Sequence, residues 1–317
     1  MKTIFITGVS GFVGSNLVRY LQDKVDINVI GHCRDIVSAR KKFKDYKIEL
    51  VTDIDAEAWD RRGVDCVIHL AGIAHDLSGR FHVNDYEIIN HRLTTEIFDQ
   101  FVMSKATSFI FLSSIKAAVD VSSFPASEEV QASPVTEYGK SKRKAEVYIE
   151  NAKCPEGKNF YIFRPCLIYG QGNKGNLKLL YQFVQRGWPY PLGAFQNQRS
   201  LLFVENLNFV FDHFLRNRCD SGIYHLSDSG SLSTLELVGL IAGLLKKKVA
   251  ILRIPSGLCS AFAAAGSWLG LPFNKEILRK LTESLVVSNR KVLHAIGCEL
   301  PYDTKTGLAI TLKSYDE

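Results

Sequence analysis

The sequence predicts an α/β fold with a doubly wound parallel sheet, followed by a smaller, mixed C-terminal lobe. Short β-branched or aromatic runs alternate with amphipathic stretches through the first half of the 317-residue chain, which is typical of strands joined by crossover helices. A glycine-rich turn follows the first run, and after Arg164 the alternation loosens while glycine and proline cluster. Single cores rarely grow past about 250–300 residues. We therefore expect one domain over residues 1–165 and a second over 166–317.

The strands of the first sheet are expected at six apolar runs. These are residues 3–7, 27–30, 48–51, 66–70, 109–113 and 160–163. A helix is expected between the first two runs, because its apolar residues recur at the spacing of helical turns. They are Val13, Leu17, Tyr20 and Leu21. Residues 201–204 and 223–226 resemble strands that return to one of the sheets, so the first domain can receive strands from residues 200–228.

Composition and charge exclude several classes of protein. The chain is 46% hydrophobic and 23% charged, which is ordinary for a globular protein, and its net charge of +6 lies in short basic clusters. We expect no nucleic-acid partner and favour a small anionic ligand. The seven cysteines form no CxxC pair, which indicates reduced thiols, a cytoplasmic location and no metal site. The N-terminus MKTIFITG reaches a glycine too early for a signal peptide.

Residues 254–273, IPSGLCSAFAAAGSWLGLPF, carry no charge over the length of a membrane span. Three serines, three glycines and two prolines make the segment only weakly apolar. We therefore expect a packed helical segment and no membrane span, with contact at a membrane surface as the alternative.

The turn after the first strand reads TGVSGFVGSNL and holds Gly8, Gly11 and Gly14, with Phe12 and Val13 between the last two. Glycines at this spacing permit a tight turn and let the backbone approach a pyrophosphate at the N-terminus of the next helix. The position of the motif, between a strand and an amphipathic helix, favours a Rossmann-type dinucleotide site over a structural turn.

The end of the second strand, NVIGHCRD, bears on the choice between NAD and NADP. An acid at this place binds the 2′-hydroxyl of NAD and repels a 2′-phosphate. Cys33 occupies that place here and Arg34 follows, and a guanidinium pairs well with a phosphate. NADP is therefore slightly preferred to NAD. Asp35 could still reach the ribose, and Arg34 as a solvated loop residue is the alternative.

The stretch VTEYGKSK places Tyr138 and Lys142 one helical turn apart. A phenol is a poor acid or base at neutral pH, and a nearby ammonium favours the phenolate. We expect Tyr138 to transfer a proton, with Lys142 tuning it and reaching the cofactor. Ser114, at the end of the fifth strand, would orient a hydroxyl or ketone. A YxxxK pair alone is common by chance, but here it follows a glycine loop and a strand-end serine in order.

Together these motifs resemble the extended short-chain dehydrogenase/reductases, specifically the nucleotide-sugar epimerase/dehydratase family, over nearly the whole chain. The motifs are TGVSGFVG, HLAG, the Asn90 helix, the serines at 113–114, YGKSK and FRPCLIYG. The resemblance implies Ser114, Tyr138 and Lys142 as the catalytic set. It also implies that Asp53, with Ile54, contacts the adenine. Leu70, Ala71, Gly72 and Asn90 are implied as further cofactor contacts.

The resemblance further implies a UDP- or dTDP-sugar as the substrate, bound by the second lobe. Asn176 and Leu177 are expected to hold the nucleotide. Arg199 is expected to bind the diphosphate, with a surface ion pair as its alternative and Arg279 as a weaker second candidate. His75 and Lys116 are further candidates for substrate contact, although a solvated side chain is an alternative for each.

The residues after Ser114 bear on the reaction. Dehydratases of this family place an acid pair there, whereas this chain has Ile115 and Lys116, so 4,6-dehydration is not expected. The favoured hypothesis is a UDP-4-keto-sugar reductase for surface polysaccharide synthesis. The alternative is a 4-epimerase of UDP-glucose or UDP-N-acetylglucosamine that holds NAD tightly. A non-catalytic NAD(P)-binding sensor or scaffold is less favoured, because the catalytic set is complete. The resemblance also implies a homodimer.

Overall fold

The computed structural model describes residues 1–73, 81–173, 175–269 and 275–315. Its central feature is a seven-stranded parallel sheet in the order β10-β7-β5-β4-β1-β2-β3. The strands are β1 (Lys2–Thr7), β2 (Ile27–His32), β3 (Glu49–Val51), β4 (Cys66–His69), β5 (Ser108–Leu112), β7 (Asn159–Pro165) and β10 (Gly222–Leu226). The order in which strands are added to the sheet reverses between β1 and β4: β2 and β3 lie on one side of β1, and the later strands lie on the other side. Open parallel sheets bind ligands beyond the carboxyl ends of the strands at such a point.

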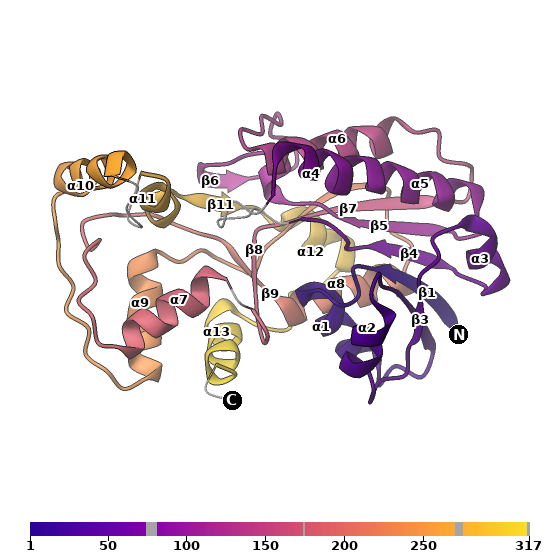
Figure 1. Ribbon diagram of the computed structural model, residues 1–317, viewed down its shortest axis with the longest axis horizontal. Helices are drawn as coiled ribbons and strands as arrows, with labels where there is room; N and C mark the ends of the chain where they lie inside the picture. Colours follow the sequence, from indigo (N-terminus) through magenta and orange to yellow (C-terminus); the bar gives the residue numbers. More distant parts are fainter. Residues whose placement is uncertain (74–80, 174, 270–274, 316–317) are drawn as a thin grey trace.

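Helices cover both faces of this sheet, as Figure 1 shows. On one face pack α1 (Phe12–Leu21), α2 (Ile36–Lys42), α8 (Val204–Arg216) and α12 (Arg290–Ile296). On the other pack α3 (Ala56–Arg61), α5 (Leu93–Met103) and α6 (Glu137–Asn151). Strand residues alternate between the two cores: Ile4 and Ile6 face the first, and Phe5 faces the second. Burial on both faces explains why the strands read as continuous apolar runs.

The remaining elements form the smaller half of the molecule and its connections. Its helices are α7 (Asn176–Gln185), α9 (Thr234–Leu244), α10 (Ser256–Leu269), α11 (Lys275–Thr282) and α13 (Thr304–Lys313). Two two-stranded sheets pair β6 (Ser122–Ala126) with β11 (Leu285–Val287) and β8 (Leu167–Tyr169) with β9 (Leu201–Phe203). Short helical segments are α4 (Val83–Tyr86), the π-helix η1 (Glu87–Arg92) and the 3₁₀ helix η2 (Ile115–Ala117).

The structure confirms the predicted fold class and the six strands of the first sheet, with ends shifted by up to two residues. It also confirms that residues 223–226 return to this sheet, as β10 beside β7. Residues 201–203 instead pair with β8 in a small separate sheet. Because α8 and α12 pack on the large sheet, its core draws on residues well beyond 165. The division at residue 165 stays a prediction.

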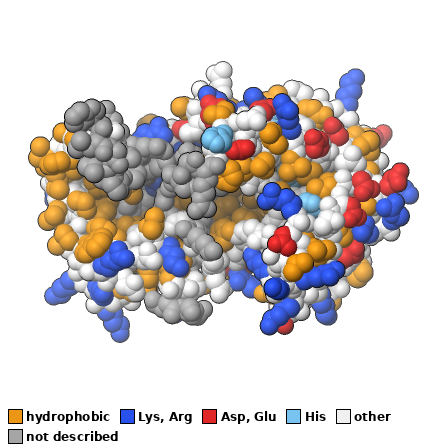
Figure 2. All heavy atoms as spheres, viewed as in Figure 1, with side chains coloured by type: hydrophobic (Ala, Val, Ile, Leu, Met, Phe, Trp, Pro, Cys, Tyr) orange, Lys and Arg blue, Asp and Glu red, His pale blue; other side chains and the backbone are white. Residues whose placement is uncertain are grey.

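The surface differs between the two halves. On the face shown in Figure 2, acidic side chains gather over the half that holds the large sheet, and hydrophobic side chains gather at the opposite end. Among the described residues, no helix combines the length and the apolar character needed to cross a bilayer.

Candidate active site

The glycine loop closes tightly at the carboxyl end of β1. Gly8 has a φ of +67°, which favours glycine, and a Cβ there would lie 2.6 Å from the backbone N of Ala71. A Cβ at Gly14 would lie 2.5 Å from the carbonyl O of Gly8. The amide of Gly11 donates to that same carbonyl at 3.0 Å. Both glycines are therefore required by close backbone approaches, as expected for this motif.

The start of α1 fits a bound pyrophosphate. Gly11 is the N-cap, and no side chain caps the first amides of the helix. Uncapped amides at a helix start are ready donors for an anion. Phe12 and Val13 begin the helix, half-buried, and the sequence places no acid in its first turn. The residues present thus fit a dinucleotide with its pyrophosphate at this helix start.

The structure brings the end of β4, η1 and α6 together beside this loop. A Cβ at Gly72 would lie 3.0 Å from Oδ1 of Asn90 and 3.1 Å from Nζ of Lys142. Asn90 is fully buried, and its side-chain amide bonds both the N and the O of Ile73, at 2.8 and 3.0 Å. Asn90 therefore fixes the backbone that follows Gly72. Leu70 and Ala71 lie between Gly72 and β4, both half-buried.

A buried histidine behind this wall was not singled out as a site residue by sequence reasoning. Nδ1 of His69 lies 2.7 Å from Oγ1 of Thr7, and Nε2 lies 2.9 Å from Oγ1 of Thr94. Burial lowers the pKa of His69 to about 3, so the ring is neutral near pH 7. The ring thus links β1, β4 and α5 by neutral hydrogen bonds. Its place in HLAG was the only signal in the sequence.

The reacting hydroxyls meet where β5 ends and α6 begins. Thr136 caps α6, with Oγ1 accepting from the amide of Gly139 at 3.1 Å. A Cβ at Gly139 would lie 2.2 Å from the carbonyl O of Lys116, so α6 can lie directly on η2. This contact brings Tyr138 to Ser114, and the two side chains are hydrogen-bonded. Burial raises the pKa of Tyr138, and the bond from Ser114 lowers it. Ser114 thus has the influence that the sequence analysis assigned to Lys142.

Lys142 lies one turn along α6 and is buried. Its Nζ donates to the carbonyl O of Leu112 at 3.0 Å and lies 4.7 Å from the ring centre of Phe111. Burial lowers the pKa of Lys142 to about 8, against the opposing effect of the Glu146 carboxylate. The ammonium therefore remains mostly charged at pH 7. It is held at the strand end beside Gly72, where it can reach a cofactor ribose.

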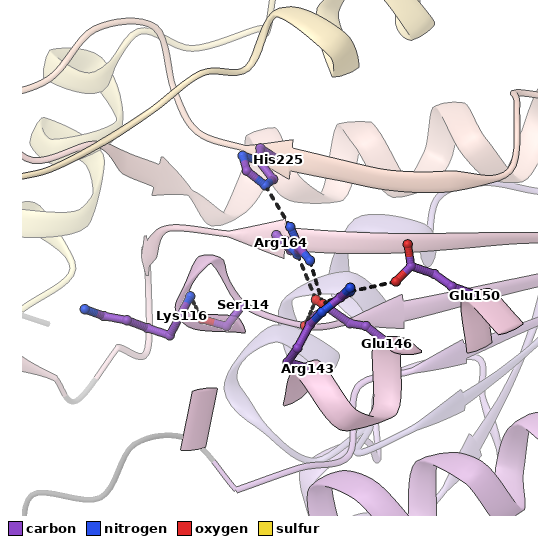
Figure 3. A network of polar contacts seen from close by, with 8 residues as sticks. Ser114, Lys116, Arg143, Glu146, Glu150, Arg164 and His225 are labelled. Carbon is purple, nitrogen blue, oxygen red and sulfur yellow. Dashed lines mark hydrogen bonds and ion pairs between the residues drawn. The ribbon is translucent and has the colours of Figure 1, made fainter. Parts of the chain in front are cut away.

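Near Ser114 and Lys142, a buried ion pair fixes α6 to the sheet (Figure 3). Glu146 accepts from Nε and Nη2 of Arg164 at 2.9 and 2.7 Å, and from Oγ of Ser113 at 2.5 Å. Nη1 of Arg164 lies 3.3 Å from Nε2 of His225 on β10. Two parallel bonds between Arg and a carboxylate define a single geometry. Glu146 is one turn beyond Lys142, so this pair sets the position of the catalytic face of α6.

The end of β2 presents cations and no free acid. The side chain of Cys33 is buried, with Sγ 3.9 Å from the carbonyl O of Val51. Asp35 caps α2, accepting from the amide and hydroxyl of Ser38. Both of its carboxylate oxygens are therefore hydrogen-bonded within its own loop. Arg34 is exposed. Lys42, which the sequence analysis did not single out, bonds the glycine loop through Ser10 O at 2.7 Å and Ser15 Oγ at 3.0 Å.

Asp53 and Ile54 follow β3, at the side of the sheet where an adenine is expected. Asp53 is exposed and pairs with Nη2 of Arg62 at 3.3 Å. Ile54 is half-buried and packs against the core of Phe5 and Trp59. The assignment of both residues to adenine contact stays a prediction.

Two cations lie on the substrate side. Nζ of Lys116 bonds the carbonyl O of Asp120 at 2.7 Å and its carboxylate at 3.2 Å. Burial lowers the pKa of Lys116, the Asp120 carboxylate and the charge of Glu283 oppose this effect, and the charge of Arg199 lowers the pKa slightly. Arg199 is half-buried, and its Nε donates to the carbonyl O of Glu283 at 3.1 Å. The assignment of Lys116 and Arg199 to substrate binding stays a prediction.

The other residues that the sequence predicts to bind the substrate lie in different parts of the structure. Leu177 is buried in the core of the smaller half, beside Tyr181. Asn176 begins α7. Arg279 is exposed on α11, and its Nε lies 3.7 Å from the carboxylate of Glu283, the residue whose backbone carbonyl O accepts from Arg199. His75 lies outside the described residues. Within the described ranges, no cluster of residues could hold a metal ion.

Comparisons with known proteins agree with this geometry. The profile of the NAD dependent epimerase/dehydratase family matches residues 4–226. The chain is 28% identical to a UDP-glucose 4-epimerase of Vibrio cholerae, covering 99% of this chain and 95% of that one.

A second relative is the N-acetyl-α-D-glucosaminyl-diphospho-ditrans,octacis-undecaprenol 4-epimerase of Escherichia coli O157:H7. It is 26% identical, covering 98% of this chain and 94% of that one. The crystal structure of UDP-N-acetylglucosamine 4-epimerase from Bacillus cereus superposes with a TM-score of 0.78 at 18% identity, covering all of both chains. The matched residues include the glycine loop, Ser114, Tyr138 and Lys142, and the chain therefore belongs to the NAD dependent epimerase/dehydratase family.

Proposed function

We propose that the protein is a 4-epimerase of a nucleotide sugar that holds its NAD(P) throughout turnover. The observation that carries the proposal is the meeting of Ser114, Tyr138 and Lys142 beside the glycine loop, with Ile115 and Lys116 in place of an acid pair. This arrangement suits proton transfer at a sugar hydroxyl and lacks the acid and base expected for loss of water.

Tyr138, Ser114 and Lys142 have different roles in the reaction at carbon 4 of the sugar. The bound nicotinamide supplies the hydride acceptor and donor. Tyr138 takes the proton of the 4-hydroxyl as the sugar is oxidised to its 4-keto form, and it returns that proton when hydride is added to the other face. Ser114 hydrogen-bonds the same oxygen and favours the phenolate of Tyr138. Lys142 holds the ribose and provides positive charge.

The order of the two hypotheses is reversed from that suggested by the sequence. The relatives from Vibrio cholerae and Escherichia coli, which match nearly the whole chain, are named as 4-epimerases, and this favours epimerisation. The second candidate is a 4-keto-sugar reductase that uses NADPH. It is favoured by the end of β2, where Arg34 is exposed and Lys42 binds the glycine loop.

A UDP-sugar is the first candidate substrate. Lys116 and Arg199 would bind its diphosphate, with their mutual repulsion relieved by the anion. The relative from Escherichia coli acts on a sugar carried by a diphospho-undecaprenol. A diphosphate beside the sugar is common to both substrates, so the same cations would serve either one.

Turnover without added cofactor tests this proposal. The purified protein is denatured, and the released nucleotide is identified by mass spectrometry. The intact protein is then given UDP-glucose and UDP-N-acetylglucosamine. We expect about one NAD per chain and formation of the 4-epimers. An empty protein that converts only 4-keto UDP-sugars with NADPH would establish the reductase, and turnover of neither substrate class would overturn both candidates.

The cofactor preference is tested at Arg34. If its guanidinium binds a 2′-phosphate, Arg34→Ala should weaken NADPH binding by about tenfold, the loss expected for one charge-assisted contact, and leave NADH binding nearly unchanged. Arg40→Ala, an exposed basic residue on α2, is the control. Binding measured by fluorescence titration would reject Arg34 as the phosphate contact if both cofactors lost affinity equally.

A homodimer through α5 and α6 is also proposed. Met103, Val147 and Tyr148 are exposed apolar residues on these helices, and a surface hollow there is lined by Val102, Val147 and Tyr148. We expect light scattering to give the mass of a dimer for the native chain and of a monomer for Met103→Glu with Val147→Glu. A native monomer would contradict the proposal.

All seven cysteines are free thiols, which supports a reducing compartment such as the cytoplasm.

A further inference from the structure

Helix α10 presents two adjacent apolar stripes, and only one of them is covered. Its sequence, SGLCSAFAAAGSWL, has no charged residue. Cys259 and Ala263, one turn apart, are buried in the core of the smaller half. Leu258 and Phe262, also one turn apart, are 53% and 67% exposed. Large apolar side chains left exposed along one stripe of a helix are candidates for contact with an apolar partner, and Leu258 and Phe262 form such a stripe.

The chain leading into α10 also carries exposed apolar side chains. Leu244, Ile251 and Leu252 are exposed large hydrophobic residues. A bridge between Ile251 and Tyr190 holds the segment against the loop after α7, where Trp188 is also exposed. Figure 2 shows hydrophobic side chains gathered at this end of the molecule. Apolar patches of this kind on a soluble fold mark interaction sites.

The same stretch is basic and free of acids. From Leu237 to Lys275 the sequence has no Asp or Glu, while it has Lys246, Lys247, Lys248, Arg253 and Lys275. Lys246, Lys248 and Arg253 are exposed. Apolar side chains beside exposed cations match the composition of an anionic lipid surface, with phosphates outside and hydrocarbon beneath.

We propose that this surface docks on an anionic lipid bilayer. The docking face consists of the exposed side chains of Leu244, Lys246, Lys248, Ile251, Leu252, Arg253, Leu258 and Phe262. Leu258 and Phe262 enter the headgroup region while the cations contact lipid phosphates. The 14 residues of α10 span about 21 Å, which is shorter than the hydrocarbon core of a bilayer, so the helix lies on the membrane.

A second copy of the chain is a poorer occupant of the docking face. Two such faces placed together would bring exposed cations opposite each other without an acid from the same stretch to pair with. Docking on lipid goes beyond the proposed epimerase activity. Because α10 packs on α11, which leads into β11 beside Arg199, docking would hold the substrate side of the molecule at the membrane.

Vesicle sedimentation of the full chain tests the inference. One set of vesicles contains phosphatidylethanolamine and phosphatidylglycerol, and the other contains phosphatidylcholine alone. We expect binding to the anionic set, weakened by high salt. Leu258→Ser with Phe262→Ser, and separately Lys246→Gln with Lys248→Gln and Arg253→Gln, should each lower the partition coefficient at least about tenfold, since each lysine or arginine near the surface contributes about fivefold.

The matched control is Val25→Ser with Val37→Ser, which removes two exposed apolar side chains from the large-sheet half and should leave binding unchanged. Native protein that stays in the supernatant, or variants that bind as the control does, would overturn the inference. It would also be overturned if light scattering showed a native oligomer that Phe262→Ser dissociates. Turnover of soluble UDP-sugar without vesicles should be equal in all these variants, so failure to dock is distinguishable from failure of the proposed function.

Discussion

Replacing Tyr138 by phenylalanine is expected to lower turnover by about 10²–10⁴-fold, the usual contribution of a positioned acid–base group. The phenol, which we propose as the proton-transferring group, is hydrogen-bonded to Ser114 at the end of β5. Phenylalanine keeps the ring and its edge-on contact with Tyr86, whose centroid lies 6.3 Å away. Cofactor affinity should therefore stay close to that of the native protein.

Tyr148→Phe is the matched control, because it removes a phenol from the exposed side of the same helix, where it bonds only the surface carboxylate of Asp99 among the contacts described here. Turnover is measured with a 4-epimer assay, and cofactor binding by titration. Near-native turnover in Tyr138→Phe would show that another group moves the proton. A parallel loss of cofactor binding would instead show that Tyr138 is structural.

Ser114→Ala tests whether Ser114 lowers the pKa of Tyr138 or only orients the sugar. The bond from Ser114 lowers the pKa of Tyr138, so its removal raises that pKa. A step that needs the phenolate is then slower at neutral pH and recovers as the pH rises. The lower limb of the rate profile should move to higher pH in Ser114→Ala. An unshifted limb with a uniformly lower rate would mean that Ser114 only orients the sugar.

Replacing Glu146 by glutamine is expected to lower the free energy of unfolding by about 3–5 kcal/mol, because it leaves a buried arginine without its counter-ion. Glu146 and Arg164 have side-chain exposures of 0% and 2%. The amide can accept one of the two bonds from Arg164 but carries no charge. The loss should be visible as a shift in the urea midpoint, and turnover should also fall, since α6 carries Tyr138 and Lys142.

Glu150→Gln is the matched control for this change. Glu150 also pairs with an arginine, Arg143, at 2.6 Å, but its side chain is 35% exposed. Exposed pairs contribute only about 0–1 kcal/mol. Adding Arg164→Met to Glu146→Gln should restore much of the lost stability, because it removes the unpaired buried charge. Equal losses for Glu146→Gln and Glu150→Gln would contradict the buried pair as a stabilising contact.

The sequence predicted local features well. Gly8 and Gly14 are required by backbone approaches of their own turn and the adjacent strand end, and such requirements leave a short motif. The placement of Tyr138 and Lys142 one turn apart on α6 follows from helical spacing alone, although the structure gives the influence on the pKa of Tyr138 to Ser114. Strands buried on both faces leave continuous apolar runs, and this is why the large sheet could be predicted strand by strand.

Other parts of the site left little sign in the sequence. Lys42 reads as one of several basic residues, yet it binds the glycine loop 27 to 32 residues earlier in the chain. Glu146, Arg164 and His225 come from α6, β7 and β10. Leu177 has the sequence position of a nucleotide contact, yet it is buried in a core. Each of these outcomes depends on which elements become neighbours.

The sequence by itself determined the fold class, the glycine loop, the spacing of Tyr138 and Lys142 and the absence of an acid pair after Ser114, because each is encoded within one turn, strand or helix. Only the tertiary structure decided the electrostatics. Burial at the meeting of β5 and α6 raises the pKa of Tyr138 and lowers that of Lys142, and burial lowers the pKa of Lys116 against the opposing charge of Asp120. Desolvation and charge proximity depend on distances between elements far apart in the chain, and these exist only once the sheet and its helices have packed.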